Sequence, residues 1–196
     1  MHGLANRALQ SFVIDTYGPR AWGDVVGAAE LGFETFEPML IYEDSLTTDV
    51  LRSCVRVLGK PTATILEDLG IYLVAHPNSE ALRRLLRFGG DTFEEFLISL
   101  EDLPERARLA VPDLELPALE VLETSKSLVE IEICTSDFGH GPVLGGVLQG
   151  LADDYGVLAT IELERISNGH ELISVQIHDL SYAEGKQFDL AQRVEP

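Results

Sequence analysis

The spacing of the hydrophobic residues changes once along this chain, at about residue 117. Before that point, apolar residues recur every three or four positions, which is typical of helices that bury one face. We therefore expect helices over residues 3–16, 20–29, 48–58, 61–75 and 79–88, and two shorter helices between 93 and 110.

After Pro117 the apolar residues alternate with polar ones, as they do in strands with one buried face. We expect strands over residues 118–123, 129–133, 158–166 and 171–178, and a helix over 141–155. This order predicts an α+β domain with a four-stranded antiparallel sheet. We divide it into a helical lobe of about residues 1–60, an α+β lobe of about 61–180, and a tail or linker over 181–196.

One position interrupts the helical pattern in an informative way. Pro104 follows Leu97 by seven residues and Leu100 by four, so it lies on the face that points into the core. Proline in a helix interior removes a hydrogen-bond donor and collides with the preceding turn. However, Asp102 and Glu105 form an Asp-x-x-Glu variant of the capping box, which predicts that a second helix begins at Asp102. Pro104 then falls in the first turn, where its missing N–H costs nothing.

The charge of the chain excludes some classes of partner. A formal net charge of −19 over 196 residues argues against binding to nucleic acid or to an anionic membrane surface. It favours solubility, with attraction to a basic partner protein as the alternative. No apolar run reaches membrane-spanning length and no signal peptide is recognisable, so we expect a cytoplasmic protein without membrane insertion. Cys54 and Cys134 show no metal-binding spacing and are expected to be buried free thiols.

Several motifs taken in order carry a family resemblance. They are Tyr17-Gly18-Pro19 with the following Trp22, LIYEDS at 40–45, Leu58-Gly59-Lys60, and LEDLPERARLAVPDLELPALE at 100–120. The resemblance that they indicate covers residue 1 to about 178. The chain resembles the H-NOX family, the haem–nitric oxide/oxygen-binding domains of soluble guanylate cyclase and bacterial gas sensors. The resemblance implies an H-NOX fold, a haem cofactor, and a signalling partner such as a histidine kinase, a diguanylate cyclase or a chemotaxis protein.

Two elements of the family's haem site are replaced in this sequence. The resemblance implies an axial histidine thirteen residues before Pro117, and this position is Pro104, which has no side-chain lone pair for iron. The Tyr-x-Ser-x-Arg motif that holds the haem propionates in the family falls on Ile133, Thr135 and Asp137. Shifted by one residue, it falls on Cys134, Ser136 and Phe138. Neither register keeps the tyrosine or the arginine.

The resemblance also implies which residues surround the family's ligand pocket. These are Leu4, Phe12, Tyr72, Phe96, Leu100, Leu103, Pro104, Pro117, Ile133, Thr135, Asp137, Phe138 and Leu144. If haem is absent, side chains must fill its volume. We expect several of Phe12, Tyr72, Phe96, Leu100, Leu103, Phe138 and Leu144 to meet across the lobe boundary. If iron is bound by another residue, His140 and His76 are the candidates.

Three functional interpretations follow from the resemblance and its departures. The favoured one is a non-enzymatic sensor or regulatory domain that works without haem, with its pocket filled or used by another apolar molecule. The second is a gas sensor that keeps haem through a non-standard ligand. The third is a constitutive scaffold for protein interaction.

The remaining motifs have ordinary structural explanations. The glycines between 139 and 146 match no phosphate-binding loop, and predict close helix-on-sheet packing with Pro142 as the first helical residue. The arginines at 83, 84 and 87 predict a solvated helix face paired with Glu80 or Asp91, with docking of an acidic partner as the alternative. Adjacent carboxylates such as Asp153-Asp154 point in different directions on a helix and form no acid–base pair.

Overall fold

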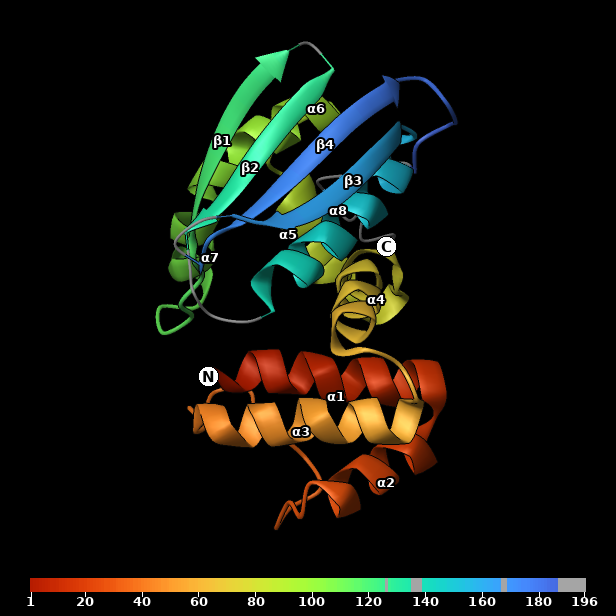
Figure 1. The fold of residues 1–196 in the computed structure, drawn as a ribbon, viewed down its shortest axis with the longest axis vertical. Coiled ribbons are helices and arrows are strands. Elements are labelled where there is room, and N and C mark those ends of the chain that lie inside the picture. The colour runs from red at the N-terminus through yellow and green to blue at the C-terminus, as the bar shows by residue number, and fades with distance from the viewer. Residues whose placement is uncertain (126, 135–138, 167–168, 187–196) are drawn as a thin grey trace, which may run out of the picture.

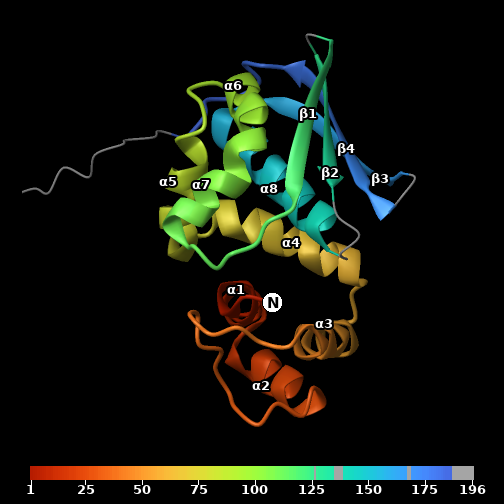
Figure 2. The ribbon, with the colours of Figure 1, turned by 90° about the vertical axis from the view of Figure 1, so that its left-hand side faces the viewer.

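The computed structural model describes residues 1–125, 127–134, 139–166 and 169–186. It consists of a helical N-terminal layer and a sheet that is covered on one face by helices (Figures 1 and 2). The helices of the first half are α1 (Gly3–Tyr17), α2 (Pro19–Ala28), α3 (Asp44–Leu58), α4 (Thr62–Ala75), the 3₁₀ helix η1 (Pro77–Ser79) and α5 (Glu80–Arg87). They are followed by α6 (Phe93–Ile98), the 3₁₀ helix η2 (Ser99–Asp102) and α7 (Leu103–Ala110).

The second half contains the sheet. Its elements are β1 (Ala118–Ser125), β2 (Leu128–Cys134), α8 (His140–Tyr155), β3 (Leu158–Arg165) and β4 (Glu171–Asp179). The strands pair antiparallel in the order β1-β2-β4-β3, which confirms the predicted α+β class and the antiparallel sheet. None of the helices in the described part of the chain has the length and apolar composition needed to cross a bilayer.

Alternation along the strands separates a buried face from an open one. On β2 the side chains of Val129, Ile131 and Ile133 are buried, and on β4 those of Ile173 and Val175 are buried. They pack with α6, η2 and α8 into one hydrophobic cluster. The opposite face of the sheet carries the polar alternates and points away from these helices (Figure 2). The two central strands, β2 and β4, therefore supply about half of their side chains to the core.

The helix boundaries near residue 100 agree with the prediction that the pattern breaks there. α6 ends at Ile98 and α7 begins at Leu103, with Asp102 at the N-cap position. The side chain of Asp102 forms no capping hydrogen bond, so that part of the prediction is wrong. The actual capping box lies at the start of α6, where Thr92 Oγ1 accepts from Glu95 N and Glu95 Oε2 accepts from Thr92 N. Its Thr-x-x-Glu spacing is visible in the sequence.

Two further boundaries differ from the sequence prediction. α3 begins at Asp44, four residues before the expected start at 48. The carboxylate of Asp44 forms an ion pair with the N-terminal amine at 2.6 Å, and a negative charge in a first turn is favourable. Pro142 is the third residue of α8 and not the first, since the helix begins at His140.

The small residues of α8 pack mainly against a helix, which corrects the predicted helix-on-sheet contact. Gly146 lies against the backbone of Glu67 and Gly70 in α4, and Gly150 lies against Val74 in the same helix. A Cβ atom at Gly70 would collide with the carbonyl oxygen of Val143. Because glycine allows such close approach, α4 and α8 are held together by direct contact of their backbones.

α4 is shared by both hydrophobic clusters. Ile65, Leu66, Leu69 and Tyr72 belong to the cluster formed with α1, α2 and α3, whereas Val74 belongs to the sheet cluster. The helix therefore links the N-terminal layer to the sheet layer, although the sequence assigns it to the second lobe alone.

The expected solvated arginine face is buried in part, which corrects that prediction. Arg83 Nε lies 2.9 Å from Asp154 Oδ1, Arg87 Nη1 lies 3.2 Å from Asp154 Oδ2, and the Asp154 side chain is fully buried. The Arg87 guanidinium also lies 3.7 Å from the centre of the Tyr155 ring. The predicted pair between Arg83 and Glu80 is present at 3.2 Å.

The first residues after β4 return to the end of α8. Ala183 N donates to Gly156 O at 3.0 Å, and Lys186 N donates to Asp154 O at 2.8 Å. The segment 181–186, expected as the start of a tail or linker, is thus hydrogen-bonded to the body of the domain. The remainder, 187–196, lies outside the described residues.

Candidate functional site

Pro104 lies where the sequence predicts, in the first turn of α7 with its ring buried. The preceding turn places Leu100 in the core without solvent exposure. Glu101 of the same turn accepts a hydrogen bond from Val121 N at 2.9 Å, which ties the start of α7 to β1. The position is therefore a fixed, inward-facing point between a helix and the edge strand.

Apolar side chains form the core into which Leu100 and Leu103, the neighbours of Pro104 in the sequence, extend. Phe96, Leu100 and Ile133 are fully buried, and Leu103 and Leu144 pack partly buried against the same cluster. Interiors of this kind are close-packed. Five of the residues predicted to surround the pocket thus form part of the sheet cluster. Of the other predicted pocket residues, Leu4 and Pro117 are half-buried, and Thr135, Asp137 and Phe138 lie outside the described residues.

Phe12 and Tyr72 meet in the other cluster, between α1 and α4. Their rings pack edge to face with centres 5.6 Å apart, across the boundary expected near residue 60. The Tyr72 hydroxyl donates to Asp15 Oδ2 at 2.7 Å, and the Asn78 amide donates to the same oxygen at 2.8 Å. His76 stacks on Tyr72 with ring centres 4.7 Å apart, and its Nδ1 lies 3.7 Å from Asp15 Oδ2.

The ionisation of this cluster reflects these contacts. The hydrogen bond from Tyr72, followed by that from Asn78, lowers the pKa of the Asp15 carboxyl below its ordinary value. Burial, with the hydrogen bond to Asp15, raises the pKa of Tyr72 to about 12. Asp15 is thus held as an acceptor and Tyr72 as a donor.

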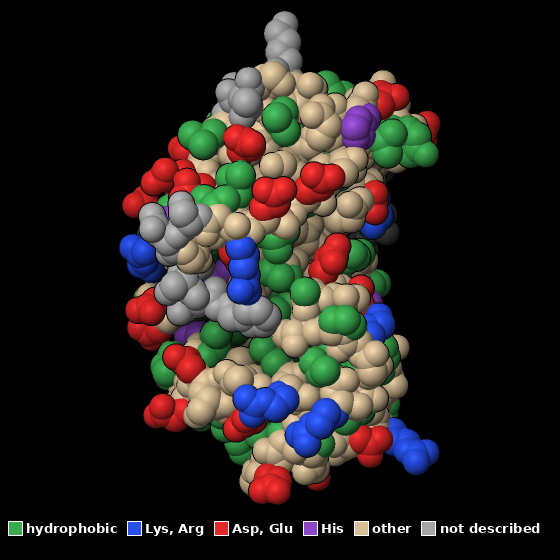
Figure 3. All heavy atoms as spheres, in the orientation of Figure 1, with side chains coloured by type: hydrophobic (Ala, Val, Ile, Leu, Met, Phe, Trp, Pro, Cys, Tyr) green, Lys and Arg blue, Asp and Glu red, His purple; other side chains and the backbone are tan. Residues whose placement is uncertain are grey.

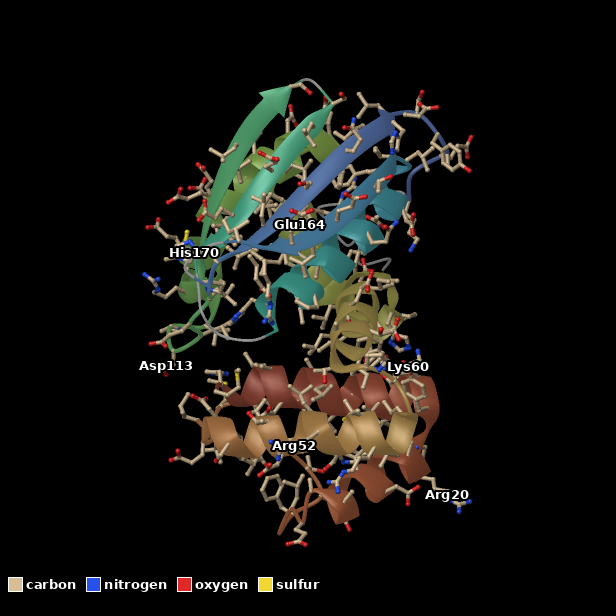
Figure 4. All side chains as sticks on the ribbon, viewed as in Figure 1. Arg20, Arg52, Lys60, Asp113, Glu164 and His170 are labelled. Carbon is tan, nitrogen blue, oxygen red and sulfur yellow. The ribbon has the colours of Figure 1, made fainter. Side chains whose placement is uncertain are left out.

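A cavity of about 410 Å³ opens beside this cluster. Three residues predicted from the sequence, Phe12, Tyr72 and His76, line it. The other lining residues are Thr16, Tyr17, Lys60, Asp68, Ile71 and Ala75. Lys60 lies at the junction of α3 and α4 (Figure 4), and its Nζ lies 2.7 Å from Asp68 Oδ2. The residues that line the cavity thus include apolar and aromatic side chains and the ion pair between Lys60 and Asp68.

The two candidate histidines have different surroundings. His76 already has partners: its Nδ1 accepts from Asn78 N at 3.3 Å in addition to the contacts above. His140 is the half-buried first residue of α8, and its Nδ1 is buried without a hydrogen-bond partner among the described residues. Such an atom costs free energy unless something binds it. Among the described histidines, His140 is therefore the one with a buried ring nitrogen that lacks a hydrogen-bond partner.

The residues at the family's haem position do not fit a haem with the usual axial ligand. Pro104 is buried and offers iron no lone pair. Ile133, on which the tyrosine of the propionate motif falls in the first of the two registers, is a fully buried aliphatic residue of the sheet core. The favourable contacts that a haem would need at these two positions are absent from the described residues.

Comparison with known proteins assigns the family. A family model described as Haem-NO-binding matches residues 2–163. The chain belongs to this family. Relatives include soluble guanylate cyclase gcy-31 of Caenorhabditis elegans, 25% identical over 118 residues, and soluble guanylate cyclase 89Da of Drosophila melanogaster, 21% identical over 155 residues. The matches cover 60% and 79% of this chain but only 17% and 23% of those relatives.

Solved H-NOX structures share the fold. The Fe(II) unliganded H-NOX protein from K. algicida has a TM-score of 0.78 at 19% identity, covering 91% of this chain and 97% of that one. An H-NOX mutant from S. oneidensis has a TM-score of 0.77 at 14% identity, with the same coverage. The H-NOX fold predicted from the motifs is therefore confirmed.

Two parts of this H-NOX domain were missed by the sequence analysis. Asp15 lies 57 residues from Tyr72, and Arg83 lies 71 residues from Asp154. No local sequence pattern links the two members of such a pair. The helical period predicts only the helix face on which each residue lies.

Proposed function

We propose that this chain is the sensor or interaction domain of a signalling protein and that it works without histidine-ligated haem. H-NOX domains are regulatory and not catalytic themselves, and this chain corresponds to less than a quarter of its cyclase relatives. The observation that carries the haem-free proposal is Pro104, buried in the first turn of α7 at the axial-ligand position. The packing of the neighbouring Leu100 and Leu103 in the sheet cluster supports the same proposal.

The arrangement of α4 suggests how such a domain transmits a signal. α4 and α8 are in backbone contact at Gly70 and Gly146, so they move together. α1 meets α4 through side chains, chiefly Phe12, Asp15 and Tyr72. A ligand in the adjacent cavity would act on that side-chain contact and displace the N-terminal layer against the sheet layer. By family resemblance, the partner that responds is a histidine kinase, a cyclase or a chemotaxis-type protein.

A second candidate keeps haem through His140. The unused, buried Nδ1 of this residue favours it over His76. In this alternative an imidazole at the start of α8 replaces the missing axial ligand. A constitutive scaffold, in which the partner binds without any ligand, is the third candidate.

A hemin titration of the purified protein separates these candidates. Without iron coordination, the visible spectrum should lack the sharp Soret and ligand-field bands of a histidine-bound haem. A stoichiometric histidine-type spectrum would overturn the proposal. If that spectrum is lost in His140→Ala and retained in His178→Ala, the second candidate is correct. Native mass spectrometry of the protein as purified then distinguishes a bound apolar molecule from a ligand-free scaffold.

A further inference from the structure

Three side chains with metal-binding atoms converge at one end of the open face of the sheet. Glu132 and Cys134 are two residues apart on β2, so both point to the polar face, and His170 immediately precedes β4. A carboxylate oxygen of Glu132, Cys134 Sγ and a ring nitrogen of His170 all lie within 4.8 Å of one another. His170 Nδ1 lies 2.6 Å from Glu132 Oε1. Figure 4 places His170 at the lower left end of the sheet.

The strand register explains this convergence. Ile133 pairs with Glu171 across β2 and β4, so the next residues outward, Cys134 and His170, come side by side. Glu120 of β1 pairs with Glu132, which brings a second carboxylate to the same face. The alternative to a ligand site is a simple Glu–His pair on a polar surface.

Cys134, which the sequence analysis expects to be buried, is only half-buried. Its side chain lies beside the carboxylates of Glu120 and Glu132 and forms a hydrogen bond with Glu120. The thiol thus faces two carboxylates at once. The ion pair that the structure gives Glu132 is with His170, which is charged only when protonated. Figure 3 shows acidic side chains distributed over the open face of the sheet. A cation bound at this point would balance the negative charges of Glu120 and Glu132.

We propose that Glu132, Cys134 and His170 form a zinc-binding site, with a water molecule as the fourth ligand. Sulfur, imidazole nitrogen and carboxylate oxygen are the donors that Zn²⁺ takes in tetrahedral sites. Bond lengths of roughly 2.0–2.3 Å place neighbouring ligand atoms about 3–4 Å apart, so the side chains need only small adjustments. The Cys134 thiol loses its proton to solvent and the thiolate binds the metal. The bound metal would link β2 to the start of β4.

The first test uses the whole chain, stripped of metal with a chelator and titrated with Zn²⁺ in competition with a chromophoric chelator. We expect one equivalent to bind. Co²⁺ in place of Zn²⁺ should give a thiolate-to-cobalt charge-transfer band and the intense visible bands of a tetrahedral site. Cys134→Ser should remove the charge-transfer band. His170→Gln and Glu132→Gln should weaken Zn²⁺ binding by more than the roughly 10- to 100-fold that follows loss of a supporting residue.

Two matched controls isolate the site. Cys54→Ser changes the buried thiol of α3, and His178→Gln changes another histidine of the open face, which pairs with Thr160. Neither should alter the stoichiometry or the cobalt spectrum. A charge-transfer band that survives Cys134→Ser would overturn the proposal. So would weak binding without that band, which indicates exposed carboxylates only.

A measurement on the unmodified chain covers the case in which a variant does not fold. Bound Zn²⁺ should slow the alkylation of Cys134. The rate is measured by mass spectrometry of the cysteine-containing peptides. The rate at Cys54 should be the same with and without the metal. Equal rates at Cys134 in both conditions would contradict the site.

Discussion

Pro104 satisfies two structural requirements at one position. Its ring fills part of the core between α7 and the sheet, and its fixed φ is suited to the first turn of a helix. The same position is the one from which the family's axial ligand would reach iron. Replacing the ring by an imidazole therefore tests packing and ligation together.

We predict that Pro104→His gains weak, five-coordinate haem binding if the core beside this position opens a cavity for the haem. The imidazole would point into the core from a helix that is already formed, but it has no propionate-binding tyrosine or arginine to assist it. Loss of the proline should also lower the free energy of unfolding by about 0.4–1 kcal/mol through the unfolded chain. Hemin difference spectra measure the first effect and urea unfolding the second.

Pro112→His provides the control for this prediction. Pro112 is exposed after the end of α7, so a histidine there has no access to the core. Equal haem spectra for the two variants would indicate surface binding and contradict the prediction.

A second prediction concerns Asp15. Its pKa is lowered in the folded state, so its contribution to stability is present above the unfolded pKa near 3.8 and lost as the pH falls through the folded value. Asp15→Asn should lower the free energy of unfolding by about 1 kcal/mol or less at pH 7, because the side chain is partly exposed. The difference from the parent should vanish once the pH lies well below the lowered pKa of Asp15.

Urea unfolding at a series of pH values measures this effect, and Tyr72→Phe identifies its source. Without the hydroxyl, the Asp15 pKa should rise toward its ordinary value, and the acid-dependent loss of stability should shrink. A parallel pH dependence in parent and Asp15→Asn would show that this carboxylate has no role.

At the scale of single residues, the sequence predicts the orientation of a side chain on a helix but not its contacts with distant segments. The orientation of Pro104 followed from helical period, because Leu97 and Leu100 fix the face. The contacts of Asp15, and the convergence of Cys134 with His170, depend on how distant segments pack and on strand register. A single sequence does not contain that information in any local pattern.

At the scale of elements, the contact between α4 and α8 is the most demanding feature of the fold. Gly146 approaches the backbone of Glu67 so closely that a Cβ atom would collide with its carbonyl oxygen. Gly145, the preceding residue, has open space around its Cα atom. Two adjacent glycines therefore have opposite structural roles.

We predict opposite effects for alanine at these two positions. Gly146→Ala should destabilise the domain by at least about 1–3 kcal/mol, because backbone atoms rather than flexible side chains must move. Gly145→Ala should stabilise it by up to about 1 kcal/mol through helix propensity. Chemical unfolding of the two variants beside the parent provides the measurement. Similar changes for both would contradict the backbone contact.

The spacing of hydrophobic residues predicts most of the helices and strands. It does not predict which elements pack against one another. The glycines of α8 correctly indicated close packing, but the predicted surface was the sheet, whereas the structure brings them against α4. The start of α3 was missed because Asp44 and the residues after it have no apolar periodicity. Its stabilising contact is with the chain's own first residue.

At the scale of the whole molecule, Asp154 connects three segments that are distant in sequence. Its carboxylate pairs with Arg83 and Arg87 of α5, and its carbonyl oxygen accepts from Lys186 N after β4. The sequence suggested an exposed basic face, since arginine is rarely buried. Burial of Arg83 and Arg87 becomes favourable here because both guanidinium groups pair with one buried carboxylate.

The final prediction is that Asp154→Ala destabilises the domain strongly. The substitution leaves two guanidinium groups, each with about 10% of the side chain exposed, without their buried counter-ion. Removing one partner of a buried ion pair typically costs about 3–5 kcal/mol. Asp153→Ala is the matched control, because this neighbour is exposed near the C-terminus of α8, where loss of a negative charge is neutral or slightly stabilising. Urea unfolding measures both variants, and the Asp154→Ala effect should change little with salt because buried charges are weakly screened. A loss below about 1 kcal/mol, or one that salt abolishes, would mean that α5 is held by its apolar face alone.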